Sequence, residues 1–260
     1  MIIIDAATHK IVISYSLPEI SYSVSAIVND TFYNIDTVNG TIFSTGIGNI
    51  LKGPDNIIWD LVGAFPSDTS PTNYIRCSSA VNGSLIYFVT NPGNLYYYDT
   101  TSRVTFEVGI VKANDFYASL VVVGNVLYIH KYHYFYSFNG TSVTSIQTPR
   151  YRYRTGLYQQ GNDVCLVGAA STLVSDPNLV YCYNPTSGQW STPSQINFAR
   201  GNPAVVTIGL KTYIFGGYDY SLSTWLDSVE VLNHATNFWG FIPTPLRGGQ
   251  AYLQALAFNF

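Results

Sequence analysis

Four of the seven arginines in this sequence stand in one register relative to short apolar runs that follow them. Each precedes by four positions a small residue that opens such a run; the pairs are Arg76 and Ala80, Arg152 and Gly156, Arg200 and Ala204, and Arg247 and Ala251. A guanidinium is a planar fork of five donors that suits carboxylates and other anions. If the fold brings the four arginines together, they could bind an anion. The alternative is that each arginine bonds backbone carbonyls of a neighbouring repeat and holds the fold together.

A second cationic stretch, PRYRYRTG, alternates arginine with tyrosine. Side chains of an extended segment point to alternate sides, so Arg150, Arg152 and Arg154 should share one face and Tyr151 and Tyr153 the other. Basic residues interleaved with aromatic ones can bind nucleic acid. This is one short stretch on a chain whose net charge is −3, and we expect no nucleic-acid partner.

Other patterns that support catalysis or metal binding are incomplete in the sequence. His130 and His133 lack a third ligand nearby, and strand alternation puts them on opposite faces. Neither a Gly-x-Ser-x-Gly elbow nor a phosphate-cradling glycine loop occurs. We therefore expect no metal, no cofactor and no enzymatic activity.

The three cysteines, Cys77, Cys165 and Cys182, form neither a disulfide framework nor a zinc-spaced set. Cys165 and Cys182 fall in one predicted repeat, on segments that can be neighbours. A disulfide between them is one alternative and two buried thiols are the other. The redox compartment stays open on this pattern alone.

The composition indicates a folded chain with few charges. Hydrophobic residues make up 47%, whereas charged residues make up only 10%, against roughly 25% in ordinary soluble domains. The longest apolar stretch, SLVVVGNVLYI, is about half of the ~20 residues that a membrane helix needs. The first residues, MIIIDAATHK, lack the pattern of an export signal. We expect no membrane insertion.

Short strands must position these residues, since runs rich in Val, Ile, Tyr, Phe and Thr are bounded by Gly, Pro, Asn and Asp. Two kinds of hairpin alternate. One has apolar arms around a glycine corner, as in SSAVNGSLIYFV. The other has an acid or amide at its corner, at Asp99, Asn139, Asn184 and Asn233, with intervals of 40, 45 and 49 residues. Two hairpins make a repeat of four strands.

A period of this length built from antiparallel strands predicts an all-β fold, a β-propeller, in one domain over residues 1–260. We expect six four-stranded blades, closed by pairing the N- and C-terminal strands in one blade. The predicted blades are 249–260 joined to 1–18, then 19–68, 69–111, 112–148, 149–198 and 199–248. Five or seven blades are the alternatives. In this fold the arginines of the common register should circle one mouth of the axial channel.

The last predicted blade resembles a kelch repeat. Its sequence, TYIFGGYDYSLSTWLDSVEVLNHATNFWGFIPTPLRGG, has a strand ending in Gly216 and Gly217, a variable loop, a second strand and then Trp239. The preceding repeat resembles it through VYCYNPTSGQW, which ends at Trp190. The resemblance implies a kelch-type propeller, whose members are mostly interaction scaffolds and occasionally enzymes. A fold alone does not determine function.

We therefore predict a non-catalytic structural or recognition propeller that binds protein or a glycan through loops at one face. The low charge and the abundance of Tyr resemble virion and cell-surface proteins, particularly those of viruses of acidophilic archaea. The specific prediction is a tail, nozzle or host-attachment component on a virion or an extracellular surface. One alternative is a glycan-active enzyme or lectin. The other is a cytoplasmic kelch-type adaptor, in which Cys165 and Cys182 would be reduced.

Overall fold

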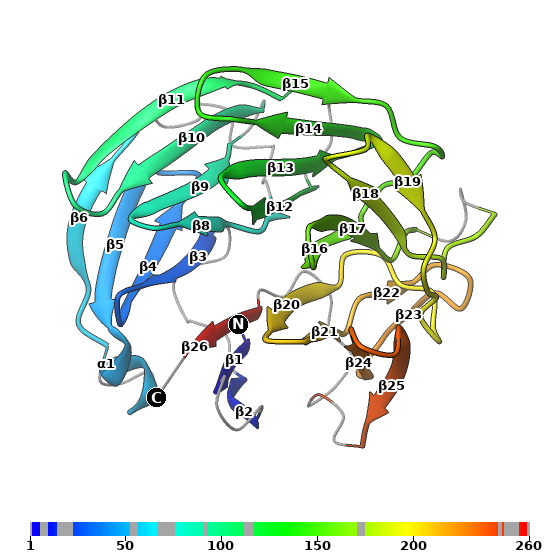
Figure 1. The fold of residues 1–260 in the computed structure, drawn as a ribbon. Coiled ribbons are helices and arrows are strands. Elements are labelled where there is room, and N and C mark those ends of the chain that lie inside the picture. The colour runs from blue at the N-terminus through cyan, green and yellow to red at the C-terminus, as the bar shows by residue number, and fades with distance from the viewer. Residues whose placement is uncertain are drawn as a thin grey trace.

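The structure of the chain is a computed structural model. It describes residues 2–5, 10–14, 23–52, 57–66, 76–90, 93–111, 117–170, 175–243, 246 and 255–258. Small antiparallel sheets stand around a common centre (Figure 1). Five of them contain a four-stranded antiparallel blade, and together they form an all-β propeller arrangement.

Each blade runs in chain order from its innermost to its outermost strand. The first blade contains β3 (Ser23–Val28), β4 (Thr31–Asp36), β5 (Thr41–Gly46) and β6 (Asp60–Ala64). The second contains β8 (Ala80–Asn82), β9 (Leu85–Val89), β10 (Asn94–Asp99) and β11 (Val104–Ile110). The third contains β12 (Tyr117–Val123), β13 (Val126–Lys131), β14 (Tyr134–Phe138) and β15 (Val143–Ile146). The fourth contains β16 (Gly156–Gln160), β17 (Asp163–Val167), β18 (Tyr181–Asn184) and β19 (Gln189–Ser191). The fifth contains β20 (Ala204–Ile208), β21 (Lys211–Phe215), β24 (Val229–Asn233) and β25 (Phe238–Ile242).

Three short elements lie outside this pattern. The strand β7 (Arg76–Cys77) pairs in parallel with β12 and adds a fifth strand to the third blade. A hairpin of β22 (Tyr218–Asp219) and β23 (Thr224–Trp225) interrupts the fifth blade between β21 and β24. The helix α1 (Ile47–Leu51) follows β5 and buries Ile47 and Ile50.

The acid or amide at each outer corner organises the turn that follows it. The Oδ1 atom of Asn184 accepts the backbone N–H groups of Thr186 and Ser187 at 3.0 and 2.9 Å, and Gly188 then takes a φ of +69°. Asp99 does the same for the N–H of Thr101. These side chains supply the turn with acceptors that the backbone lacks there, which explains why the corner recurs.

The core lies between adjacent blades, and tryptophan joins them in two places. The ring of Trp190 packs 5.4 Å from that of Phe135 in the third blade, and its Nε1 donates to the carbonyl of Gln147 at 2.9 Å. In the fifth blade, Trp239 packs edge-on against Tyr158 of the fourth, with ring centroids 6.2 Å apart. Each tryptophan thus packs against the blade before its own.

The described terminal strands form a three-stranded sheet, so the number of four-stranded blades is five rather than the predicted six. β1 (Ile2–Asp5) pairs antiparallel with β2 (Lys10–Ser14) and parallel with β26 (Ala255–Phe258). A blade of the expected form needs another strand between β26 and β1, and the described residues place none there. β26 lies beside β20 of the fifth blade and β3 of the first. Closure of the ring as a six-bladed propeller stays a prediction.

Candidate functional site

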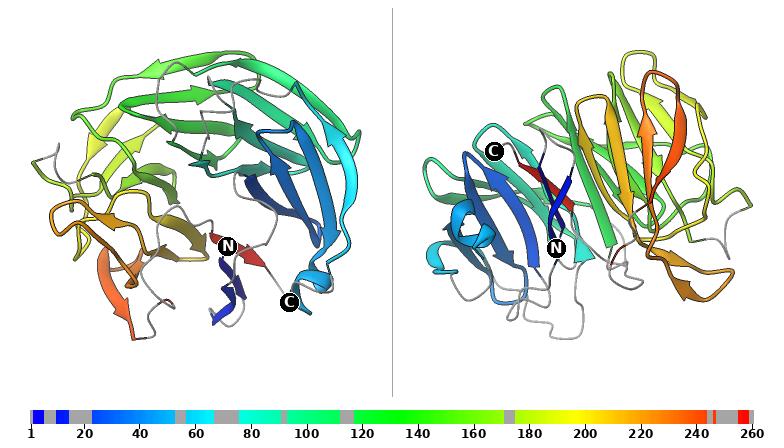
Figure 2. Two further views of the ribbon diagram at one scale, coloured as in Figure 1. Left: turned by 180° about the vertical axis from the view of Figure 1, so that it is seen from behind. Right: turned by 90° about the horizontal axis from the view of Figure 1, so that it is seen from below.

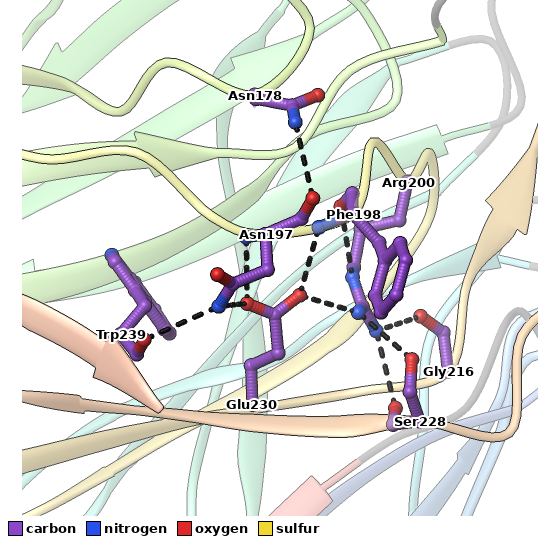
Figure 3. Close-up of polar contacts among 8 residues, drawn as sticks. All are labelled: Asn178, Asn197, Phe198, Arg200, Gly216, Ser228, Glu230 and Trp239. Atoms are coloured by element: carbon purple, nitrogen blue, oxygen red, sulfur yellow. Dashed lines mark hydrogen bonds and ion pairs between the residues drawn. The ribbon is translucent and has the colours of Figure 1, made fainter. Parts of the chain in front are cut away.

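Arg200 is fully buried and bonded within the fifth blade, as Figure 3 shows. Its Nη1 donates to the carbonyl oxygens of Gly216 and Ser228 at 2.7 and 3.1 Å. Its Nη2 donates to Ser228 Oγ at 3.0 Å and to Glu230 Oε1 at 2.7 Å. Burial lowers the pKa of Arg200, and the Glu230 carboxylate opposes that shift by favouring the charged form.

The Glu230 carboxylate also holds the chain segment that joins the fourth blade to the fifth. Its Oε2 accepts the backbone N–H and the side-chain amide of Asn197 at 2.8 and 2.7 Å, and its Oε1 accepts the N–H of Phe198 at 3.2 Å. Asn178 of the fourth blade donates to the carbonyl of Asn197 (Figure 3). Four donors saturate this buried carboxylate, so the Arg200–Glu230 pair links two blades.

Arg152 occupies a similar position in the fourth blade. Its side chain is 2% exposed, and its Nη2 donates to the carbonyl oxygen of Asp176 at 2.5 Å and to Asp176 Oδ1 at 3.2 Å. Nη1 donates to the carbonyl of Gly168 at 3.4 Å, and the guanidinium lies 4.4 Å from the centroid of the Tyr181 ring. Burial lowers the pKa of Arg152 and the Asp176 carboxylate opposes this.

The sequence places these arginines around the channel mouth, and for the register as a whole this stays a prediction. The central cavity, about 600 Å³, is lined by the innermost strands of the blades and by β26, and neither Arg152 nor Arg200 lines it. Their guanidinium groups turn into the blades, where backbone carbonyls, carboxylates and the Ser228 hydroxyl accept the bonds described above. They therefore have the stapling role that the sequence left as the alternative, with carbonyls of their own blade rather than of a neighbour.

The other two arginines of the register are less fully described. Arg76 lies in β7, where the backbone pairs with Tyr117 of β12. Arg247 lies outside the described residues. An anion site formed by all four arginines stays a prediction.

The stretch 150–154 crosses the end of the propeller where blades are connected. This end, which we call the connection face, carries the turn 132–133, the connections 147–155 and 192–203, and the hairpin β22–β23. Arg150 donates to Ser175 Oγ at 3.4 Å, on the side where Arg152 meets Asp176. Tyr151 and Tyr153 point the other way, toward Tyr132 of the third blade.

These tyrosines complete an aromatic group, which we call the tyrosine cluster: Tyr132, His133, Tyr134, Tyr151 and Tyr153. The imidazole of His133 lies 4.0 Å from the Tyr134 ring and 4.4 Å from the Tyr151 ring. Tyr132 lies beside both His133 and Tyr153, at 4.5 and 5.9 Å. Tyr151 is 60% exposed, and Tyr132 and Tyr134 are each 39% exposed. The cluster is an unusually aromatic patch for a solvent-facing surface.

Arg154 joins the tyrosine cluster to the fifth blade. Its φ of +63° breaks the alternation and turns its guanidinium over three rings, at 4.9 Å from Tyr117, 5.3 Å from Tyr220 and 5.8 Å from Tyr153. Its Nη1 also donates to the Tyr220 hydroxyl. Tyr220 belongs to the hairpin β22–β23, drawn in orange in Figure 2, where Trp225 is 47% exposed. The aromatic surface therefore spans three blades.

The sequence alone identified only part of this surface. It selected Arg150, Tyr151, Tyr153 and Arg154 from their alternation, and missed the turn at Tyr132 and the hairpin. Both features are visible in the sequence as aromatic residues. YIHKYHYFY places them at a strand turn, and YDYSLSTW places them in the variable loop of the kelch-like repeat.

The two histidines near the cluster differ in environment. His130 is buried, its Nδ1 lies 2.7 Å from Thr155 Oγ1, and burial together with the Arg152 cation lowers its pKa to about 3. Burial also lowers the pKa of His133. Within the described parts of the chain, no group of three or more His, Cys, Asp or Glu residues is placed to hold a metal ion.

Cys165 and Cys182, for which the sequence left a disulfide and two buried thiols as alternatives, are joined by a disulfide bond. They are directly opposite in the β17–β18 ladder, and both are buried in the fourth blade. Stable disulfides are typical of oxidising compartments. Among the helices that the structure describes, none has the length and apolar character to cross a bilayer.

Comparison with known proteins places the kelch resemblance in the C-terminal part of the chain. Residues 199–245 match the family model described as Kelch motif. A stretch of 89 residues is 29% identical to Kelch-like protein 23 of Mus musculus and, to the same extent, to Kelch-like protein 23 of Homo sapiens. It covers 33% of this chain and 15% of each relative's length. The chain thus carries a kelch motif within a β-propeller, an architecture that is typically protein-binding and non-catalytic.

Proposed function

We propose that this chain is a non-catalytic recognition module that binds a protein partner through the connection face. The tyrosine cluster carries the proposal, together with the hairpin β22–β23 that Arg154 ties to it. Tyrosine, tryptophan and arginine are the residues most enriched at the energetic centres of protein interfaces. Tyrosine offers a large contact area with few rotatable bonds, so ordering it on binding costs little entropy.

The cluster is also preorganised. The rings of Tyr134, His133 and Tyr151 lie one against the next, and Arg154 holds three further rings. Side chains already fixed by their neighbours lose less freedom when a partner binds, which raises affinity. A surface assembled from three blades is large enough for a protein rather than a small molecule.

The central cavity supports the non-catalytic part of the proposal. Its lining is mostly aliphatic, and its titratable side chains among the described residues are Tyr158 and His234. Burial raises the pKa of Tyr158 and lowers that of His234, so both are neutral near pH 7. Acid–base catalysis uses groups whose pKa lies near the working pH, and these two are shifted away from it.

The experiment is site-specific photo-cross-linking in the native source, with p-benzoylphenylalanine at position 151 or at position 238. Phe238 is a matched control, since it is an exposed aromatic residue (69%) at the start of β25, on the opposite face. We expect a defined protein adduct from position 151 that is lost when Tyr132 is changed to Ala. Adducts from position 238 alone would refute a partner on the connection face.

The setting of this interaction is a finer proposal. Few charged residues and the Cys165–Cys182 disulfide support an extracellular or virion surface, where a tail, nozzle or host-attachment component would work. A cytoplasmic adaptor would keep both cysteines reduced, so the disulfide favours the extracellular setting. Mass spectrometry of purified virus particles from the source tests this, and absence of the chain from them would exclude the virion role.

A glycan ligand is the second candidate, because exposed rings such as Tyr151 and Trp225 can stack on sugars. A glycan array and a hydrolysis screen separate the possibilities. Saturable glycan binding that Tyr151→Ala abolishes would indicate a lectin, and turnover would indicate an enzyme.

We also infer that the terminal sheet closes the ring as a reduced sixth blade. Ala255 and Ala257 pack against the core of the fifth blade, and Leu256 packs against the cluster around Phe32 of the first. Deleting residues 255–260 should therefore lower the midpoint of thermal unfolding, measured by circular dichroism. An unchanged midpoint would show that the ring is stable without this sheet.

A further inference from the structure

We propose that this chain forms a two-fold dimer in which the β11 strands of two copies pair antiparallel about Thr105. β11 is the outermost strand of the second blade and lies at the rim of the ring (Figure 1). It has 7 residues, whereas the other outermost strands, β6, β15, β19 and β25, have 5, 4, 3 and 5. Within the described chain it pairs with β10 alone, so its outer edge is open.

Apart from a bulge at Val108 and the charge of Glu107, β11 lacks the features that usually protect an edge strand. Natural edges are short or carry Lys, Pro or inward-pointing charges, because an open ladder otherwise recruits another strand. β11 reads VTFEVGI, with Glu107 as its one charged residue. Val104 is 44% and Phe106 43% exposed, and Leu61 of the adjacent β6 is 65% exposed. Exposed apolar side chains therefore gather beside the open edge, as at association sites.

The backbone of β11 presents Thr105 to this open edge. The Asp99 carbonyl points toward β11, where it accepts the N–H of Arg103 at 2.8 Å. Val104, the register partner of Asp99, must then direct its own N–H and C=O toward β10. Peptide groups alternate sides along a strand, so those of Thr105 point outward and can bond a second copy.

The charges on and beside the strand favour one register. With the two-fold axis at Thr105, Val104 of each copy lies opposite Phe106 of the other. Arg103, the last residue of the turn before β11 (φ +58°), then lies near Glu107 of the other copy. Opposite charges and apolar pairs placed across a ladder both stabilise it. An axis at Glu107 would instead oppose two like charges. Arg103 and Glu107 are both exposed. Glu107 Oε2 accepts the Tyr96 hydroxyl at 3.3 Å, and among the described residues nothing else bonds this carboxylate, which leaves Oε1 for the second copy.

An orphaned polar atom lies on the same axis. Thr105 Oγ1 is buried and has no hydrogen-bond partner among the described residues. Buried hydroxyls are nearly always bonded, so an isolated one calls for an explanation. In the proposed dimer, rotation about χ1 brings each Thr105 hydroxyl from this buried position to the open edge, where the two form a cross-strand pair and each supplies the other's missing partner. The contact is isologous and therefore closes at two copies.

The test is sedimentation velocity on the full 260-residue chain over a dilution series. We expect concentration-dependent dimers. Glu107→Arg should weaken dimerisation about tenfold or more, because two attractive pairs become repulsive. The double variant Arg103→Glu with Glu107→Arg restores the pairing and should restore the dimer. Arg150→Glu, a charge reversal at an exposed site on the connection face, should leave it unchanged.

Disulfide trapping tests the register directly. In a Cys77→Ser background, Thr105→Cys should give an intermolecular disulfide under oxidised glutathione, since the two copies of position 105 are opposite. Val104→Cys should not, because it lies opposite position 106. Circular dichroism checks that each variant is folded. A chain that stays monomeric to about 1 mM would overturn the proposal, as would a dimer insensitive to Glu107→Arg.

Discussion

The Arg200 guanidinium meets the Glu230 carboxylate at 2.7 Å with both side chains fully buried. Glu230 at the same time accepts three N–H bonds from the connection between the fourth and fifth blades. The pair is therefore a joint between two sheets, beside backbone bonds such as that from Ala169 N–H to the Arg200 carbonyl. If either partner were removed, the other would be left as an unpaired charge in the protein interior.

Removing one partner of this joint should cost far more than removing both. Arg200→Ala or Glu230→Ala leaves an uncompensated buried charge, and we expect a loss of about 3–5 kcal/mol in the free energy of unfolding. Arg200→Met with Glu230→Leu should lose less than the sum of the single changes. Urea unfolding followed by tryptophan fluorescence measures all of them. The control is Arg150→Ala, an exposed change that should have little effect; a similarly small loss for Glu230→Ala would refute the joint.

The Cys165–Cys182 bond closes a loop of 17 residues within the fourth blade. Constraining a loop of that length in the unfolded chain contributes about 3 kcal/mol to stability. Cys165→Ala with Cys182→Ala, or reduction with dithiothreitol, should therefore lower the thermal midpoint. Cys77→Ala should not reproduce the sensitivity to reductant. Alkylation of the unreduced, denatured chain followed by intact mass spectrometry should modify one cysteine; three modified cysteines would show that the bond is absent.

His130 should make the fold less stable in acid. Its pKa is about 3 in the folded chain, whereas a histidine in the unfolded chain titrates near 6.5. Below pH 6.5 the imidazole of His130 is protonated in the unfolded state but stays neutral in the folded state. Stability should therefore fall as the pH drops from 6.5 toward 3, by about 4 kcal/mol in all. Urea midpoints at pH 7 and 4.5 measure the effect.

The matched variants for this pH dependence are His130→Gln and His133→Gln. Glutamine at position 130 can still bond Thr155 and cannot titrate, so most of the pH dependence should disappear. His133 is only partly buried, and its replacement should change the slope much less. Equal slopes in the wild-type chain and in His130→Gln would contradict the burial of a neutral imidazole.

Gly156 should be required by close contact between innermost strands. A Cβ placed there would lie 2.2 Å from Cγ2 of Val205 in the next blade. Gly156→Ala should therefore lose about 1–3 kcal/mol by overpacking. Adding Val205→Ala should recover part of the loss. Gly48→Ala is the control, because nothing lies within 4 Å of that position. A neutral Gly156→Ala would mean that the strands can separate at no cost.

The elements that depend on local chemistry could be predicted from the sequence. Asp99 and Asn184 marked the outer corners because their side chains organise the turns, and the kelch-like spacing led to Trp239 and its blade. The direction of a long side chain could not be predicted in this way. Arg152 and Arg200 have the expected register, but their carbonyl and carboxylate partners come from residues 16 to 30 positions later. The tyrosine cluster likewise depends on two loops meeting, which no single repeat encodes.

The pairing of Ile2 with Ala255 joins two strands from opposite ends of this sequence in one small sheet. During synthesis, β1 is made before its parallel neighbour β26 and cannot pair with it until residues 255–258 have emerged. Until then the ends of the first and fifth blades face water. A nascent chain stalled before residue 255 would expose apolar edges of the kind that chaperones and proteases recognise. The β1–β26 pair is thus a contact that can form only after all five blades have been synthesised.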